Sequence, residues 1–368
     1  MNRAATYRVA GCLWAAALLA LVACGHRHER PTPYDIEIPY GFPTRLNIPA
    51  DNPMTVEGVA LGERLFHDPH LCGYAGDDPD SLMSCASCHN RAHNFDIGPD
   101  SPRLEHGRAL GRRGKATRHN VMPLTNLVFN HEGYFWNGGV RAGSADGHSS
   151  IEDIVQMAIE ADDELCGTEA LALAALRADS KYPEMFAKAF GTEEITMDRV
   201  RKAIAQYVRS LVSGNAKFDR YLQGKEQLTP QELHGYILFT TEEGADCFHC
   251  HGSEGSPLFT TNLFYNNGLD LTPDDPHDRF SITGDAGDHG AYRAPSLRNV
   301  AVSAPYMHDG RFQTLDEVLN FYNEGLQPSP YVSPLMHHIN DGGVLLTPSE
   351  IADLKAFLMT LTDEEFLR

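Results

Sequence analysis

Two short cysteine–histidine motifs hold the residue types best suited to chemistry in this 368-residue chain. Both follow the pattern Cys-x-x-Cys-His, which is the attachment signature of c-type haem. Two thiols one helical turn apart add to the two vinyl groups of the porphyrin, and the adjacent histidine then lies under the iron. The predicted haem residues are Cys85, Cys88 and His89 in the first motif and Cys247, Cys250 and His251 in the second.

Other cysteine chemistries fit the two motifs less well. A structural zinc ion would need two more ligands at each motif, or both cysteine pairs meeting at one ion. A thioredoxin-like redox site would need a βαβ context, which this sequence lacks. The repetition of the motif, the histidine after each pair and an export signal at the N-terminus all favour haem.

The first 24 residues are typical of an export signal. Two arginines give a basic start, and residues 9–22 form an apolar run that is short for a membrane span. The run ends in Leu-Val-Ala-Cys24, which resembles the lipobox of a bacterial lipoprotein. We therefore expect residues 1–23 to be removed, Cys24 to be lipidated and residues 24–40 to form a tether. An uncleaved anchor helix and an ordinary signal peptide are the alternatives, and all three predict export.

The remaining cysteines and the net charge narrow the possibilities further. Cys72 and Cys166 lie outside both motifs, and in an oxidising compartment they are expected to form one disulfide, with two thiols as the alternative. The chain has 50 acidic and 30 basic residues, and a formal charge of −20. Nucleic acid is therefore excluded as a partner, because binding it requires a basic face. An acidic surface suits a basic electron donor such as a small cytochrome c.

A weak internal repeat surrounds the two haem motifs. Gly-x-x-Leu-Phe precedes each of them, starting at Gly62 and at Gly235. Downstream, Phe135-Trp136-Asn137-Gly138 precedes one amphipathic segment, and Tyr306-Met307-His308-Asp309-Gly310 precedes another. Two similar haem domains in tandem are the simplest account of this repetition.

The predicted fold is mainly α-helical, with two tandem cytochrome-c-like haem domains and long loops. The domains are expected over residues 41–225 and 226–368. Residues 252–300 are rich in Gly, Asp, Asn and Pro and are expected to be loop wrapped around a cofactor. Apolar residues at helical spacing predict helices over Ile151–Glu160, Thr196–Ser213, Glu232–Thr240, Leu315–Tyr322 and Glu350–Leu361.

Aligning the two repeats pairs Tyr322 with Ala158. A tyrosine phenolate can ligate iron and an alanine cannot, so the second haem would be closed by Tyr322 while the first keeps an open face beside Glu152. An open haem face beside a carboxylate is suited to activating peroxide. The alternative for Tyr322 is a packed helix aromatic. Other possible ligands of the second iron are Met307, His308, Met336, His337 and His338.

From Gly41 to Arg368 the chain resembles the bacterial di-haem cytochrome c peroxidase family, which includes the MauG-like enzymes. The matching stretches are Leu61-Gly62-x-x-Leu65-Phe66, Ser84–His89, Phe135–Gly138, Ser210–Gly214, Pro295–Val300 and Ala304–Gly310. The resemblance implies a peroxidatic haem in the N-terminal domain and an electron-transfer haem in the C-terminal domain. It also implies a calcium ion between them, with the backbone carbonyls of Ser303 and Pro305 among its ligands.

The resemblance also assigns roles to single residues. Twelve residues after Gly310, one branch of the family has a methionine ligand and the MauG-like branch has tyrosine, which is Tyr322 here. The carboxylate of the first haem pocket maps onto Glu152 as a proton shuttle, with a dipole-stabilised helix-start carboxylate as the alternative. A removable distal histidine of some members would lie near His106, which we interpret as a surface residue.

The function implied by the resemblance is that of a periplasmic, lipid-anchored di-haem peroxidase. It would reduce hydrogen peroxide to water with electrons that arrive through the second haem from a donor protein. One alternative is a MauG-like enzyme that oxidises residues of a partner protein. Another is a non-enzymatic electron-transfer cytochrome, which would need strong ligands closing both irons, and Ala158 argues against that.

Overall fold

The computed structural model describes residues 30–74, 82–144, 146–252 and 256–368. The predicted signal sequence, Cys24 and the first part of the predicted tether lie outside these residues. Within the described ranges, no helix combines the length and apolarity needed to cross a membrane.

The fold is mainly α-helical with long loops, which confirms the predicted fold class. The helices are α2 (Val56–His67), α3 (Ile151–Glu160), α4 (Glu169–Ala178), α5 (Tyr182–Phe190), α6 (Met197–Ser210), α7 (Lys217–Leu222), α8 (Pro230–Phe239), α9 (Phe248–His251), α10 (Phe280–Thr283), α11 (Leu315–Glu324) and α12 (Pro348–Met359). Two antiparallel pairs of short strands join β1 (Leu104–Glu105) to β2 (Arg108–Ala109), and β3 (Phe264–Tyr265) to β4 (Tyr292–Arg293). All five predicted helices are present, whereas α2, α4, α5, α7 and the short α9 and α10 were not predicted from the sequence.

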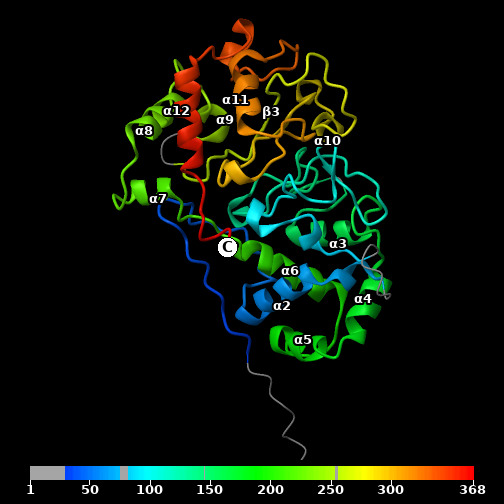
Figure 1. Ribbon diagram of the computed structural model, residues 1–368. Helices are drawn as coiled ribbons and strands as arrows, with labels where there is room; N and C mark the ends of the chain where they lie inside the picture. The colour runs from blue at the N-terminus through cyan, green and yellow to red at the C-terminus, as the bar shows by residue number, and fades with distance from the viewer. Residues whose placement is uncertain (1–29, 75–81, 145, 253–255) are drawn as a thin grey trace, which may run out of the picture.

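An equivalent pair of packed helices lies at the core of each half (Figure 1). In the lower half α2 packs against α6, and in the upper half α8 packs against α12. Gly62 and Gly235, the first residues of the repeated Gly-x-x-Leu-Phe, lie where the helices approach most closely. A Cβ atom would be 1.9 Å from the Ala203 carbonyl oxygen at Gly62 and 1.9 Å from the Asp353 carbonyl oxygen at Gly235. The repeat therefore encodes two equivalent helix crossings.

The turns that lead into α3 and α11 are duplicated as well. An antiparallel bridge starts at Tyr134 before α3, and another starts at Tyr306 before α11. Each helix then begins with a capping box, in which the side chain of Ser150 or Thr314 accepts a hydrogen bond from the backbone three residues later. The two helices that were aligned in the sequence thus occupy equivalent positions.

The two halves interlock at a buried polar contact. The Asn299 side chain donates to Asn94 Oδ1 at 2.9 Å and to Ser213 Oγ at 3.1 Å. Asp363, beyond α12, accepts from the backbone of Gly214 at 3.1 Å. The C-terminus accordingly lies at the boundary between the halves, next to α6 (Figure 1).

Contacts near two predicted domain boundaries are as follows. Helix α7 precedes the predicted boundary at 225/226, and its Phe218 packs in the core of the C-terminal half, with its ring 5.3 Å from that of Phe357. Within the predicted tether over 24–40, the backbone N–H groups of Thr32 and Tyr34 donate to Glu57 and to the Met54 carbonyl oxygen of the N-terminal half. The domain boundaries remain a prediction.

Candidate active site

The second haem motif lies on the wall of a large apolar crevice in the C-terminal half. The thiols of Cys247 and Cys250 and the ring of His251 all line it. Burial raises the pKa of each thiol to about 12 and lowers the pKa of His251 to about 4. Two neutral thiols and a neutral imidazole in an apolar crevice are the groups that a covalent haem requires, so these residues fit the cofactor.

The motif histidines are oriented by backbone carbonyls. Nδ1 of His251 lies 3.1 Å from the Pro295 carbonyl oxygen, and Nδ1 of His89 lies 2.7 Å from the Phe95 carbonyl oxygen. A carbonyl oxygen can only accept, so Nδ1 carries the proton and Nε2 keeps the lone pair that binds a metal. In the first motif the left-handed backbone of Phe95 (φ 58°) belongs to the turn that brings this carbonyl back to His89.

The first motif has the same local construction. Cys85 begins a short 3₁₀ turn, and the His89 N–H bonds to the Cys85 carbonyl oxygen at 3.0 Å, so both thiols and the imidazole lie on one helical turn. Burial raises the pKa of Cys85 and of Cys88 to about 12 and lowers the pKa of His89. These residues fit a second covalent haem.

Tyr322 of α11 lines the crevice of the second motif. Its hydroxyl oxygen accepts a hydrogen bond of 2.9 Å from Nδ2 of Asn267. Burial raises the pKa of Tyr322, while the bond from Asn267 acts in the opposite direction and favours the phenolate. Asn267 has no sequence signature of its own, and the sequence analysis missed it.

The rival ligands of the second iron line the same crevice, but the histidines among them have other partners. The His308 ring stacks on Tyr292 with centroids 3.7 Å apart, His337 Nδ1 lies 3.1 Å from Asp246, and His338 Nε2 lies 3.1 Å from the Glu242 carbonyl oxygen. Among the described residues of the crevice, Tyr322, Met307 and Met336 have no ionic partner, and the Tyr322 ring lies edge-on to Phe321 with centroids 4.9 Å apart. Tyr322 remains our candidate.

Glu152 lies in a buried ion pair. Its two carboxylate oxygens accept from both terminal nitrogens of Arg209, at 2.7 and 2.8 Å, and Oε1 also accepts from Asn52 at 2.7 Å. Burial acts to raise the pKa of Glu152, but the bonds and charge of Arg209 outweigh it and hold the pKa below its usual value. A carboxylate that is kept ionised and held by two hydrogen bonds from Arg209 is poorly suited to shuttling protons. This geometry therefore favours a structural role for Glu152, in which its ion pair with Arg209 joins α3 to α6.

A different carboxylate, Glu164, lies beside the first motif. Burial, followed by the charge of Asp163, raises its pKa to about 7, and its own charge raises the pKa of both Cys85 and Cys88. The sequence analysis missed it because it sits in the acidic run 160–164, which is typical of a solvated loop.

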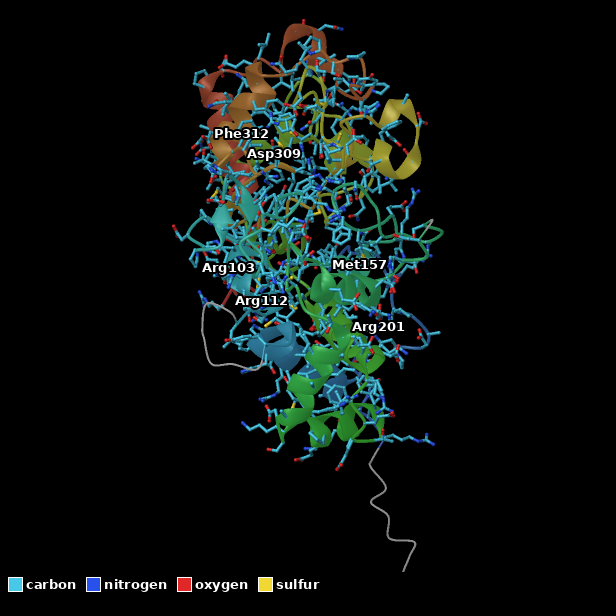
Figure 2. All side chains as sticks on the ribbon, turned by 90° about the vertical axis from the view of Figure 1, so that its right-hand side faces the viewer. Arg103, Arg112, Met157, Arg201, Asp309 and Phe312 are labelled. Carbon is cyan, nitrogen blue, oxygen red and sulfur yellow. The ribbon has the colours of Figure 1, made fainter. Side chains whose placement is uncertain are left out.

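Arg112 fixes the loop that carries Glu164. Its side chain donates to the carbonyl oxygens of Leu165 at 2.8 Å and Cys166 at 2.6 Å, and its backbone N–H donates to that of Glu164 at 2.8 Å. Figure 2 shows Arg112 and Arg103 on the opposite side of the N-terminal half from Met157 of α3, with Asp309 and Phe312 in the half above. The loop is thus held by Arg112 as well as by α3, whose Ala158 carbonyl oxygen accepts from the Leu165 N–H at 3.1 Å.

A buried amide lies next to one of the carbonyls implied as a calcium ligand. Asn120 Nδ2 donates to the Pro305 carbonyl oxygen at 2.6 Å, while Asn120 Oδ1 is buried without a hydrogen-bond partner. Turning the amide over would bring two oxygens together, an arrangement that a hard cation stabilises. Ser303, the other implied ligand, is buried two residues before Pro305. The residues fit a calcium ion, for which Asn120 Oδ1 would be a side-chain ligand that the sequence did not identify.

Trp136 connects the halves. It comes from the N-terminal half, is buried, and lines the crevice of the second motif. Its indole N–H donates to the Asn120 carbonyl oxygen at 2.9 Å, and its own carbonyl oxygen accepts from the Arg293 N–H at 2.7 Å.

The predicted disulfide and His106 are two further candidates from the sequence. No disulfide joins Cys72 to Cys166 in the described structure, where the Cys72 thiol donates to the Pro69 carbonyl oxygen at 3.2 Å. The two segments are nevertheless in contact, since a Cβ on Gly167 would lie 2.7 Å from the Cys72 carbonyl oxygen. His106 is exposed in the turn between β1 and β2.

Comparisons with known proteins agree with this geometry. The sequence profile described as di-haem cytochrome c peroxidase matches residues 56–227. Methylamine utilization protein MauG of Methylorubrum extorquens is 33% identical, over 88% of this chain and 83% of that protein. Cytochrome c551 peroxidase of Nitrosomonas europaea is 28% identical, over 86% and 84%. The solved structure of a MauG-like protein associated with microbial copper homeostasis is 33% identical, with a TM-score of 0.76 over 91% of this chain and 97% of that one.

Proposed function

We propose that this chain, which belongs to the di-haem cytochrome c peroxidase family, divides peroxide reduction between two unequal haem sites. Family membership makes it a peroxidase with two c-type haems. We assign peroxide to the first motif and electron entry from a donor protein to the second. When bound, the haems supply one iron that binds peroxide and one that relays electrons. The supporting observation is the asymmetry of the protein groups: Glu164 lies beside one motif and Tyr322 faces the other.

Glu164 is the proton carrier in this proposal. A carboxyl group whose pKa is raised to about 7 exchanges protons readily at neutral pH. It would accept the proton of one peroxide oxygen and return it to the other, so that the O–O bond breaks and one water departs. Two electrons from the donor protein and two further protons would convert the remaining oxygen atom to a second water. Glu152, which the sequence suggested for this role, instead holds α3 against α6 through Arg209.

Tyr322 is the proposed distal ligand of the second iron, opposite His251. An anionic phenolate is a hard ligand that favours the oxidised state of iron. The bond from Asn267 supports ligation, because it stabilises the phenolate form. Trp136, which reaches from the first half into this crevice, is the proposed group for electron passage between the two sites.

The proposal also includes a calcium site between the halves and a periplasmic location for the protein. Asn120 Oδ1 and the carbonyls of Ser303 and Pro305 would hold a calcium ion between the halves, supported by the unpartnered buried oxygen of Asn120. The sequence of residues 1–24 supports a periplasmic protein anchored by lipid on Cys24.

A second candidate function is oxidation of residues in a partner protein by peroxide, as in the MauG-like branch. Tyr322 favours it, because that branch carries tyrosine at this position. The non-enzymatic cytochrome has less support, since Ala158 offers the first iron no ligand. Parallel assays with a reduced small cytochrome c and with candidate partner proteins, read by mass spectrometry, distinguish the two activities.

The test of the proposed function is Glu164→Gln. We expect both haems to be retained and peroxide turnover to fall about 10²–10⁴-fold, the usual contribution of a positioned proton carrier. Glu160→Gln is the matched control, because Glu160 is an exposed carboxylate four residues earlier. Steady-state turnover with reduced cytochrome c measures the effect, and a loss below about threefold would remove Glu164 from the mechanism.

A further inference from the structure

Three potential metal ligands converge at the rim of the second haem crevice. They are Glu242 in the turn after α8, His249 inside α9 and His337 at the start of a 3₁₀ turn over His337–Asp341. One potential ligand atom from each lies within 4.8 Å of those from the other two. A tetrahedral ion bound at about 2.0–2.1 Å keeps its ligand atoms roughly 3.4 Å apart, so small side-chain movements would close the set.

A fourth residue, Asp246, orients both imidazoles. Its Oδ1 lies 2.5 Å from Nδ1 of His249, and its Oδ2 lies 3.1 Å from Nδ1 of His337. The contact with His249 is a hydrogen bond that the carboxylate accepts, so Nδ1 of His249 carries the proton and its Nε2 keeps the lone pair, while Nδ1 of His337 lies in contact with the same carboxylate. A carboxylate behind a metal-binding histidine is the usual way in which proteins fix that ring. One carboxylate serving two histidines is difficult to explain by folding alone.

The exposed fractions of the Asp246 and Glu242 side chains indicate different roles for the two carboxylates. The side chain of Asp246 is only 6% exposed, which leaves it behind the imidazoles. The side chain of Glu242 is 65% exposed, and its Oε1 lies 3.8 Å from Nε2 of His249, on the side of that ring away from Asp246. The Glu242 backbone is held to the same 3₁₀ turn, because its carbonyl oxygen lies 3.1 Å from His338 Nε2. Ions in solution can therefore reach the site without rearrangement of the backbone.

We infer that Glu242, His249 and His337 form a binding site for a divalent transition-metal ion such as Zn²⁺ or Cu²⁺, with Asp246 as the positioning residue. Two imidazoles and one carboxylate suit these borderline ions, whereas Ca²⁺ and Mg²⁺ prefer oxygen ligands alone. Three protein ligands leave a coordination position for water.

The site is placed to influence the second haem. His249 lies within the attachment motif, between Cys247 and Cys250, and both Asp246 and His337 line the haem crevice. A bound ion would join two walls of the crevice that otherwise meet through side chains. Its positive charge would also favour the reduced state of the neighbouring haem. Metal loading should therefore raise both the thermal midpoint of the holoprotein and the reduction potential of its second haem.

The experiment uses the holoprotein, stripped with EDTA and then returned to buffer containing CaCl₂ so that any calcium site is refilled. We expect one equivalent of Zn²⁺ by equilibrium dialysis with elemental analysis, and with Cu²⁺ an electron paramagnetic resonance signal showing nitrogen coupling. His337→Ala and Glu242→Gln should each weaken Zn²⁺ binding roughly 100-fold or more, and Asp246→Asn about 10–100-fold. His234→Ala is the control, because His234 is an exposed histidine paired with Asp353.

Two results would overturn the proposal. One is wild-type holoprotein that retains no Zn²⁺, or retains it equally in His337→Ala and in the control. The other is a changed ferric haem spectrum in metal-free His337→Ala, which would assign His337 to the haem iron. His337 lies outside the attachment motif, so its replacement leaves both thioether linkages intact, as a pyridine haemochrome ratio of two haems per chain would verify.

Discussion

The two haem motifs have the same local construction and different surroundings. In both, a helical turn carries two partly buried thiols, and a backbone carbonyl orients the histidine through Nδ1. Beyond that turn the halves diverge: α3 presents Ala158 where α11 presents Tyr322. A carboxyl group lies beside each motif, but burial raises the pKa of Glu164 to about 7, whereas Asp246 accepts a hydrogen bond from His249.

The two halves share a helical framework and differ in the side chains that face the haem sites. The duplicated helix crossings at Gly62 and Gly235 and the duplicated turns before α3 and α11 build two equivalent frames. In the proposed function, a few side chains that project from those frames distinguish peroxide chemistry from electron transfer. Changing these side chains should therefore alter chemistry at one haem, whereas changing the frame should alter the stability of one half.

The largest expected effect comes from removing one haem altogether. In the double variant Cys247→Ala with Cys250→Ala, the second porphyrin loses both thioether bonds. We expect one covalent haem per chain in place of two by pyridine haemochrome, and loss of donor-dependent turnover because electrons no longer enter. A ratio of one haem per chain in the wild-type protein would contradict the assignment of a haem to each half.

The next effect is a pH dependence that belongs to the first site alone. Below its raised pKa of about 7, Glu164 is protonated and cannot accept the peroxide proton. We expect kcat/KM for peroxide to fall roughly tenfold per pH unit below that point and to level off above it. Glu164→Gln should lose this inflection, and its persistence in the variant would assign the titration to another group.

The fold class and the duplicated helix crossings could be predicted from the sequence, because they depend on local spacing, and the haem residues stay a prediction that rests on the same kind of spacing. The sequence did not predict partners that arrive from far along the chain. Arg209, 57 residues from Glu152, turns a plausible proton carrier into one side of an ion pair. The raised pKa of Glu164 comes first from burial and then from the charge of Asp163, and Asn120 meets Pro305 across 185 residues.

The third prediction concerns the second site. Tyr322→Met replaces a phenolate with a thioether, which favours ferrous iron, so the reduction potential of that haem should rise while the first haem is unchanged. Spectroelectrochemical titration resolves the two haems. Tyr322→Phe serves as the companion variant: an unaltered ferric spectrum and potential would place the ligand elsewhere, with Met307 and Met336 as the next candidates.

The smallest expected effects come from the shared frame. Gly62→Ala and Gly235→Ala each force a methyl group against a backbone carbonyl that cannot yield without separating two helices. Overpacking of this kind typically costs about 1–3 kcal/mol of the free energy of unfolding. Gly287→Ala is the control, since a Cβ there meets only Asp285 Oδ1 at 3.4 Å. Urea unfolding of the holoproteins, followed at each haem, should show similar losses that start in opposite halves. A loss confined to one variant would mean that the two crossings are not equivalent, and that the duplication extends to the motifs but not to the frame that carries them.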